Sequence, residues 1–89
     1  MNAFYSDFKY EVVTEVSSQE NPRRNWLGLE ILFETNNFQK ARKECIEWAA
    51  YDDIPVRVVR RVGAGGHVKF KCDGYHEAIS RYPKTAMNF

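Results

Sequence analysis

Two cysteines and two histidines are the residues of this chain best suited to metal binding or nucleophilic catalysis. Cys72 and His76 are four residues apart, and Cys45 and His67 complete a set of two of each type. Structural zinc sites place paired ligands on short knuckles, whereas Cys45 falls on the apolar stripe of a predicted helix. No third group is placed to orient the Cys72–His76 pair for catalysis. We therefore expect core cysteines, no metal, no cofactor, no catalytic residue and a protein that is not an enzyme.

A glycine-rich segment at residues 63–66 has the composition of a phosphate-binding loop. It joins two predicted strands and does not open a helix, so the N-terminal helix dipole that would hold a phosphate is missing. Glycines also permit the positive φ angles of tight turns. The segment is therefore predicted to be the turn of a hairpin.

Cations are concentrated on the two strands of this hairpin. Residues 54–89 carry a net charge of +5 and residues 1–53 a net charge of −4. The cationic side chains on one strand face are Arg57, Arg61, Lys69 and Lys71, with His67 at the edge and Tyr75 beside them. They could bind phosphates, with Tyr75 stacking on bases. The alternative is pairing within the sheet with glutamates of the first two strands, Glu11, Glu15, Glu30 and Glu34. The total net charge of only +1 favours this internal pairing.

A second candidate surface combines an aromatic residue with arginines, which is the composition of a protein-binding hot spot. Trp26 follows Arg23 and Arg24, and Glu30 is expected close to it on the uncovered sheet face. The predicted protein-contact residues are Arg23, Arg24, Trp26, Glu30, Arg57 and Arg61.

Hydrophobic periodicity predicts the elements that position these side chains. Alternation of period two indicates strands at 8–16, 27–33, 54–62 and 67–72, and helical spacing indicates a main helix at 36–51 and a short one at 75–81. Asn36 and Gln39 form a predicted capping pair. Residues 17–25 form a long, exposed polar connection, and the tail after Pro83 has no clear structure. We expect one domain spanning residues 1–89, with flexible ends at 1–7 and 84–89.

These elements predict an α+β fold of ββαββ(α) order, in which a mixed four-stranded sheet has the main helix on one face. The second strand has apolar residues on both faces, which is typical of a central strand. If the last strand inserts between the second and third, a split-βαβ or ferredoxin-like variant with spatial order 1-2-4-3 results. The order 1-2-3-4 is the alternative.

The order of strand, helix, hairpin and helix from Leu29 to Ala78 resembles that of ferredoxin-like modules such as the SPOR peptidoglycan-binding domain and the RNA-recognition motif. Residues 66–71 lack the pattern of stacking aromatics that the middle strands of the RNA-recognition motif carry. A SPOR-type assignment fits poorly with a chain in which no export or membrane segment is found. Because topology alone does not imply function, no family is assigned.

We expect a small, cytoplasmic, non-enzymatic protein-interaction module with no membrane contact. Its size and lack of motifs suggest a regulator or inhibitor of a host protein complex, of the kind encoded by phages or mobile elements. A nucleic-acid-binding module that uses the basic hairpin face is the alternative. Homodimerisation through an edge strand is a third interpretation.

Overall fold

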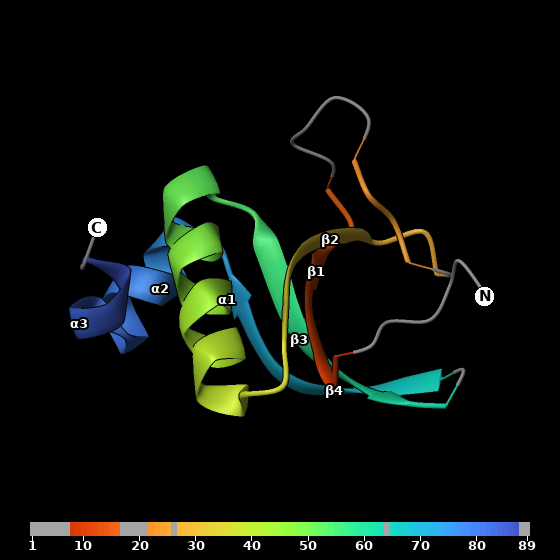
Figure 1. Cartoon of the computed structure of the whole chain (residues 1–89). Helices are drawn as coiled ribbons and strands as arrows, with labels where there is room; N and C mark the ends of the chain where they lie inside the picture. The colour runs from red at the N-terminus through yellow and green to blue at the C-terminus, as the bar shows by residue number, and fades with distance from the viewer. Residues whose placement is uncertain (1–7, 17–21, 26, 64, 88–89) are drawn as a thin grey trace.

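The computed structural model describes residues 8–16, 22–25, 27–63 and 65–87. The predicted α+β class is confirmed, with a four-stranded sheet and helices on one side of it (Figure 1). The elements in chain order are β1 (Tyr10–Thr14), β2 (Glu30–Thr35), α1 (Phe38–Asp52), β3 (Pro55–Val62), β4 (Gly65–Asp73), α2 (Tyr75–Arg81) and α3 (Pro83–Ala86). The expectations for residues 1–7 and for Trp26 lie outside the described residues.

The strand order is β2-β1-β3-β4, so both predicted orders were wrong. Every neighbouring pair is antiparallel, and the sheet is therefore not mixed. The strand that separates β2 from β3 is β1, and not the last strand as the sequence suggested. Its place follows from its side chains: Val12 and Val13 are both fully buried, and Glu11 lies within 2.9 Å of the Arg61 guanidinium on β3.

A bulge explains why β2 has the sequence pattern of a central strand. Val12 pairs with Phe33 and Val13 pairs with Ile31, which leaves Leu32 as an extra residue without a partner on β1. Leu32 and Phe33 both pack on the core beneath α1. The run Ile31–Phe33 therefore looks two-faced in the sequence, although β2 is an edge strand.

The outer edge of β2 is covered at its start by the segment that precedes it. The Ile31 amide donates to the carbonyl of Arg23 at 2.8 Å, and Arg24 forms an isolated antiparallel bridge with Glu30. Asn25 is buried, although the sequence predicted an exposed polar connection up to this residue. Residues 17–21 of that connection lie outside the described residues.

Helix α1 begins and ends close to its predicted bounds. Its N-cap is Asn37, whose side chain accepts from the Lys40 amide at 3.1 Å, and not Asn36 as predicted. Asn36 instead accepts from the Lys9 amide at 2.8 Å and ties the loop to the start of β1. The helix ends at Asp52, and its C-cap is Asp53, a left-handed residue with φ of 54°.

The core lies between α1 and the sheet. Its fully buried members include alanines and Cys45 on α1, Val12 on β1 and Val56 and Val58 on β3. Helices α2 and α3 pack beside α1, whereas the β3–β4 hairpin extends from the opposite end of the molecule (Figure 1). Ala86 is fully buried, so the tail predicted to lack regular structure begins with the short helix α3. Within the described residues, no helix combines the length and apolar character needed to cross a membrane.

Candidate protein-interaction surfaces

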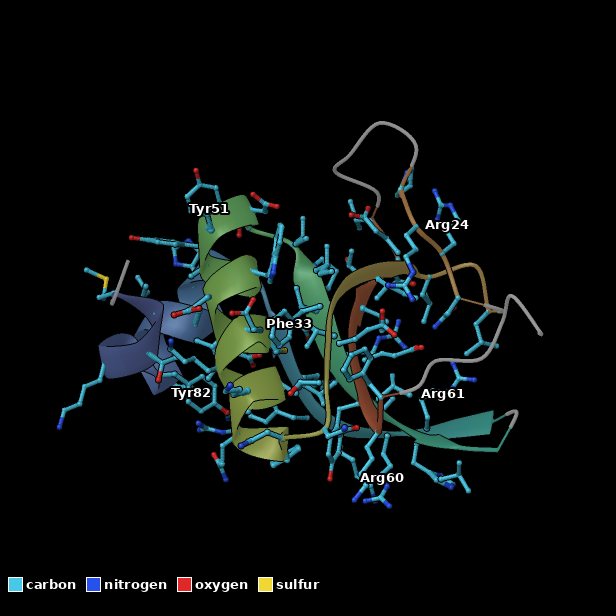
Figure 2. The ribbon with its side chains drawn as sticks, viewed as in Figure 1. Arg24, Phe33, Tyr51, Arg60, Arg61 and Tyr82 are labelled. Atoms are coloured by element: carbon cyan, nitrogen blue, oxygen red, sulfur yellow. The ribbon has the colours of Figure 1, made fainter. Side chains whose placement is uncertain are left out.

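The sheet face turned away from α1 contains a buried ion pair. Val12 and Val58 point to α1, so the alternating residues Glu11 and Arg61 point the other way. Arg61 Nη1 lies 2.9 Å from Glu11 Oε2, and the two side chains are only 6% and 1% exposed. Asn25 Nδ2 donates to the second oxygen, Glu11 Oε1, at 3.2 Å. Arg61, labelled in Figure 2, is therefore committed to holding the sheet together.

Two further arginines of the predicted surfaces also pair with glutamates. Arg57 Nη2 lies 3.5 Å from Glu15 Oε1 in an exposed pair, and Arg23 hydrogen-bonds and pairs with the carboxylate of Glu34. Pairing with the hairpin cations, the alternative considered from the sequence, is therefore present for Glu11 and Glu15, whereas Glu34 pairs with Arg23 of the segment before β2. These bonds reduce the number of cations available to phosphates on this face.

The other predicted protein-contact residues do not form one open patch with Arg57 and Arg61. Arg24 Nη1 donates to the carbonyl of Gly28 at 2.8 Å, which closes a tight turn ahead of β2. Glu30 is almost fully buried where it bridges to Arg24, and Trp26 lies outside the described residues.

Asn25 organises this turn, and sequence reasoning missed its role. Its side-chain oxygen accepts from the amides of Leu27 and Leu29 at 2.9 and 3.1 Å. Gly28 adopts a φ of 81°, a left-handed conformation that favours glycine. An asparagine three residues before a glycine is a signal for such a turn, but the apolar run that follows is also typical of a strand.

A group of exposed basic side chains lies on β4 and comprises Lys69, Lys71 and His67. Lys71 Nζ is 3.9 Å from Asp73 Oδ2, a long and solvated contact. Val68 lies between these cations and is 52% exposed, although alternation predicts it on the core face with Phe70. A bulge causes the difference, because Phe70 pairs with Val58 and Val68 with Val59, leaving Lys69 as the extra residue.

Strand β4 also forms the uncovered edge of the sheet, since no other described strand lies beyond it. At its end, the Asp73 amide donates outward to Glu77 Oε1 at 2.8 Å, which caps the edge there. Tyr75, predicted to stack on bases, follows this cap and is partly exposed with its ring 5.9 Å from that of His76. From Gly65 to Lys71, no described strand pairs with the outer side of β4.

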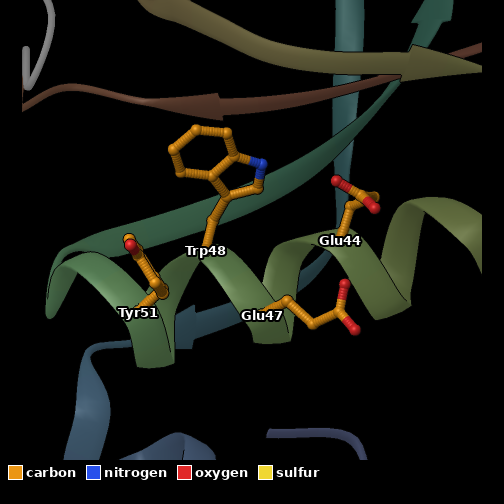
Figure 3. A pocket seen from close by; sticks show the side chains of 4 residues that line it. All are labelled: Glu44, Glu47, Trp48 and Tyr51. Carbon is orange, nitrogen blue, oxygen red and sulfur yellow. The ribbon is translucent and has the colours of Figure 1, made fainter. Parts of the chain in front are cut away.

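A groove of about 260 Å³ lies on the flank of α1 and is lined by Glu44, Glu47, Trp48 and Tyr51 (Figure 3). Burial, and then the neighbouring charge of Glu47, raises the pKa of the Glu44 carboxyl. A hydrogen bond from Trp48 and the charge of Lys43 act in the opposite direction. The spacing of these residues puts them on one helix flank, where Trp48 is partly buried and packs against the core.

The two cysteines are poor nucleophiles in this structure. Cys45 Sγ donates to the Val56 carbonyl at 3.3 Å, and burial raises its pKa well above the usual range. Burial, followed by the charges of Glu77 and Asp73, raises the pKa of Cys72 to about 11. Neither thiol is ionised appreciably near neutral pH, which disfavours attack by a thiolate. Nor do three or more His, Cys, Asp or Glu side chains gather as metal ligands within the described part of the chain.

Comparisons with protein-family models, with curated proteins and with solved structures found no match for this chain. Its function must therefore be inferred from the chemistry of its own surfaces. Two surfaces present exposed groups that could bind a partner: the cationic edge of β4 and the groove on α1 with its carboxylates and aromatic rings.

Proposed function

We propose that this chain is a small non-enzymatic protein-interaction module that takes an extended acidic segment of its partner as an additional strand beside β4. The observation that carries the proposal is the uncovered edge from Gly65 to Lys71, which combines outward backbone groups with exposed cations. In strand addition, main-chain hydrogen bonds provide affinity and alternate side chains provide specificity. A segment with acidic residues at alternate positions would satisfy both.

The two edges of the sheet differ in a way that supports this choice. Residues 23–25 cover the start of β2, and the Ile31 amide already donates to Arg23. Among the described residues, strand β4 has no comparable cover. Its hairpin also exposes Val62 at 55% and Val68 at 52%, which supplies apolar contact area beside the charges.

The charge of β4 selects the kind of partner. Lysines on an edge strand discourage pairing with a second copy, because like charges would face each other across the new ladder. The same lysines attract a strand that carries Asp or Glu. A homodimer through this edge is therefore disfavoured relative to an acidic partner.

Nucleic-acid binding has less support. Arg61 is buried against Glu11 and Arg57 is paired with Glu15, so two of the predicted phosphate-binding cations are already engaged. Titration of labelled single-stranded and duplex oligonucleotides at two salt concentrations tests this alternative. Tight binding that weakens steeply with salt would favour nucleic acid over an acidic peptide.

Selection from a displayed library of random dodecapeptides tests the proposal directly, because such a library offers acidic, neutral and basic segments together. We expect the enriched peptides to carry Asp or Glu at alternate positions. The variant Lys69→Glu, Lys71→Glu should bind them at least about tenfold more weakly, whereas the control Lys40→Glu, Lys84→Glu, with the same net charge, should bind like the wild type. Both control lysines are exposed and lie away from β4.

Amide hydrogen exchange gives a second readout, because a bound strand should slow exchange along β4 and leave the outer edge of β2 unchanged. Enriched peptides without acidic residues would refute the proposal. Equal binding by the two double variants, or protection outside β4, would do the same.

A further inference from the structure

We propose that the groove lined by Glu44, Glu47, Trp48 and Tyr51 binds an arginine side chain from a basic segment of a partner protein. This surface lies on α1, is opposite in charge to β4, and does not depend on the function proposed for the strand edge. The chain would then have two recognition sites, one for an acidic strand and one for a cationic side chain.

The geometry of the groove suits a planar cation. Figure 3 shows the Trp48 ring and the Glu44 side chain directed from α1 towards the strands, with Tyr51 and Glu47 along the same stretch of helix. A guanidinium group can stack on an aromatic ring while its N–H groups bond to carboxylates. Indole, phenol and two carboxylates are the groups that this mode of binding requires.

The groove has a volume of about 260 Å³, which is enough for one side chain. Tyr51 is 75% exposed, so a partner can reach its ring without any change in the fold. Large exposed aromatics beside charges are common among the residues that dominate protein interfaces.

Charge along this stretch of α1 is unbalanced. No Lys or Arg follows Lys43 in the helix, and the last turn has no basic residue. Asp53 has a structural role, because its carboxylate accepts from the Tyr75 amide at 2.8 Å. Glu47 is partly neutralised by Lys43 at 3.6 Å. Glu44 is half-buried against Trp48, and a cation in the groove would offset the cost of keeping it ionised.

Fluorescence of Trp48 provides a direct assay. In a Trp26→Phe background Trp48 is the only indole. Titration with N-acetyl-arginine amide at constant ionic strength should change its emission saturably, with a dissociation constant in roughly the millimolar range expected for one side chain. N-acetyl-citrulline amide has nearly the same shape without the charge, and it should leave the emission unchanged.

Variants connect the signal to the groove. Glu44→Gln and Tyr51→Ala should each weaken arginine amide binding at least about fivefold, while Glu15→Gln, which removes an equal charge on the far sheet face, should not. Because the Tyr51 ring is exposed, Tyr51→Ala keeps the test valid even if Glu44→Gln disturbs folding. As a further readout, the pKa of Glu44 measured by carbon NMR should fall when arginine amide binds.

Three results would overturn the proposal: citrulline amide binding as well as arginine amide, both groove variants binding like Glu15→Gln, or Trp48 emission changing on dilution of the chain alone. The last result would identify a second copy of the chain as the occupant. The Lys69→Glu, Lys71→Glu variant should bind arginine amide normally, so failure of the β4 proposal would be distinguishable from failure of this one.

Discussion

Removal of the buried charge on β1 is the sharpest test of how this sheet is held together. Glu11 and Arg61 are 1% and 6% exposed, and their closest atoms are 2.9 Å apart. In Glu11→Gln the side chain keeps its shape, and its oxygen can still accept from Asn25 Nδ2, but the charge that faces Arg61 is lost. The variant therefore isolates the ionic contribution.

The expected loss is large for a chain of this size. Breaking a buried pair by removing one partner costs about 3–5 kcal/mol, because the remaining charge stays in a poorly solvated site. We expect about 3 kcal/mol for Glu11→Gln, since the hydrogen bond to Asn25 is retained. A domain of this length has a free energy of unfolding of only about 5–13 kcal/mol. The melting temperature should fall by roughly 12 °C or more.

Urea unfolding monitored by circular dichroism measures the effect, with Glu15→Gln as the matched control. Glu15 also pairs with an arginine of β3, at 3.5 Å, but both side chains of that pair are substantially exposed. Solvent screening should keep the control loss below about 1 kcal/mol. If both variants lose the same stability within about 1 kcal/mol, the buried pair does not have the role inferred for it.

A double variant separates the attraction between Glu11 and Arg61 from the cost of burying their charges. Glu11→Leu, Arg61→Met removes both charges and should be more stable than Glu11→Gln, because the amide of Asn25 that loses its acceptor costs less than an uncompensated buried charge. A double-mutant cycle with the two single changes measures the coupling between them. Additive losses would show that Glu11 and Arg61 act independently and would refute the reasoning.

Two further predictions concern the backbone. A methyl group added at Gly66 would lie 2.6 Å from Val59 Cγ1, so Gly66→Ala should lower the free energy of unfolding in urea by about 1–3 kcal/mol. At the control position Gly65 the nearest contact is 3.6 Å away, and Gly65→Ala should cost less than about 1 kcal/mol. Equal losses would contradict the crowding at Gly66. Asp53→Ala should lower the free energy of unfolding by about 1–2 kcal/mol, because it removes the acceptor for the Tyr75 amide and places alanine at a φ of 54°. The control Asp53→Asn keeps an acceptor and should retain most of the stability. A loss in Asp53→Asn as large as in Asp53→Ala would show that the charge, and not the cap, matters.

Local patterns in the sequence were sufficient to place most elements. Helical spacing located α1 to within two residues at each end, and the bounds of α2 were predicted correctly. The glycines at 63–66 marked the hairpin of β3 and β4. These predictions succeed because each depends on residues close together in the chain, where periodicity and turn chemistry act directly.

The strand order could not be read in this way. Contacts between segments far apart in the chain determine which strands are neighbours in a sheet. The bulges in β2 and β4 also interrupt the alternation of side chains, so the sequence pattern assigns some residues to the wrong face of the sheet. The extra residue Leu32 made β2 look central, and the extra residue Lys69 placed Val68 on the wrong face. A one-residue shift in register transfers every later side chain to the opposite side of the sheet. Burial of Asn25 was hidden for the same reason, because its partner Glu11 lies 14 residues earlier.

The candidate surfaces are formed by charged side chains that the pairing of β1 with β3 does not use. The chain divides into an acidic first part and a basic second part, and placing β1 beside β3 brings Glu11 and Glu15 into contact with Arg61 and Arg57. Charges outside these two pairs include Lys69 and Lys71 on the outer strand β4 and Glu44 and Glu47 in the middle of α1. A sheet with the order 1-2-3-4 would have placed the second strand between the glutamates of the first and the arginines of the third, leaving a larger basic face. The observed strand order therefore separates the cations that stabilise the sheet from those that remain available to a partner.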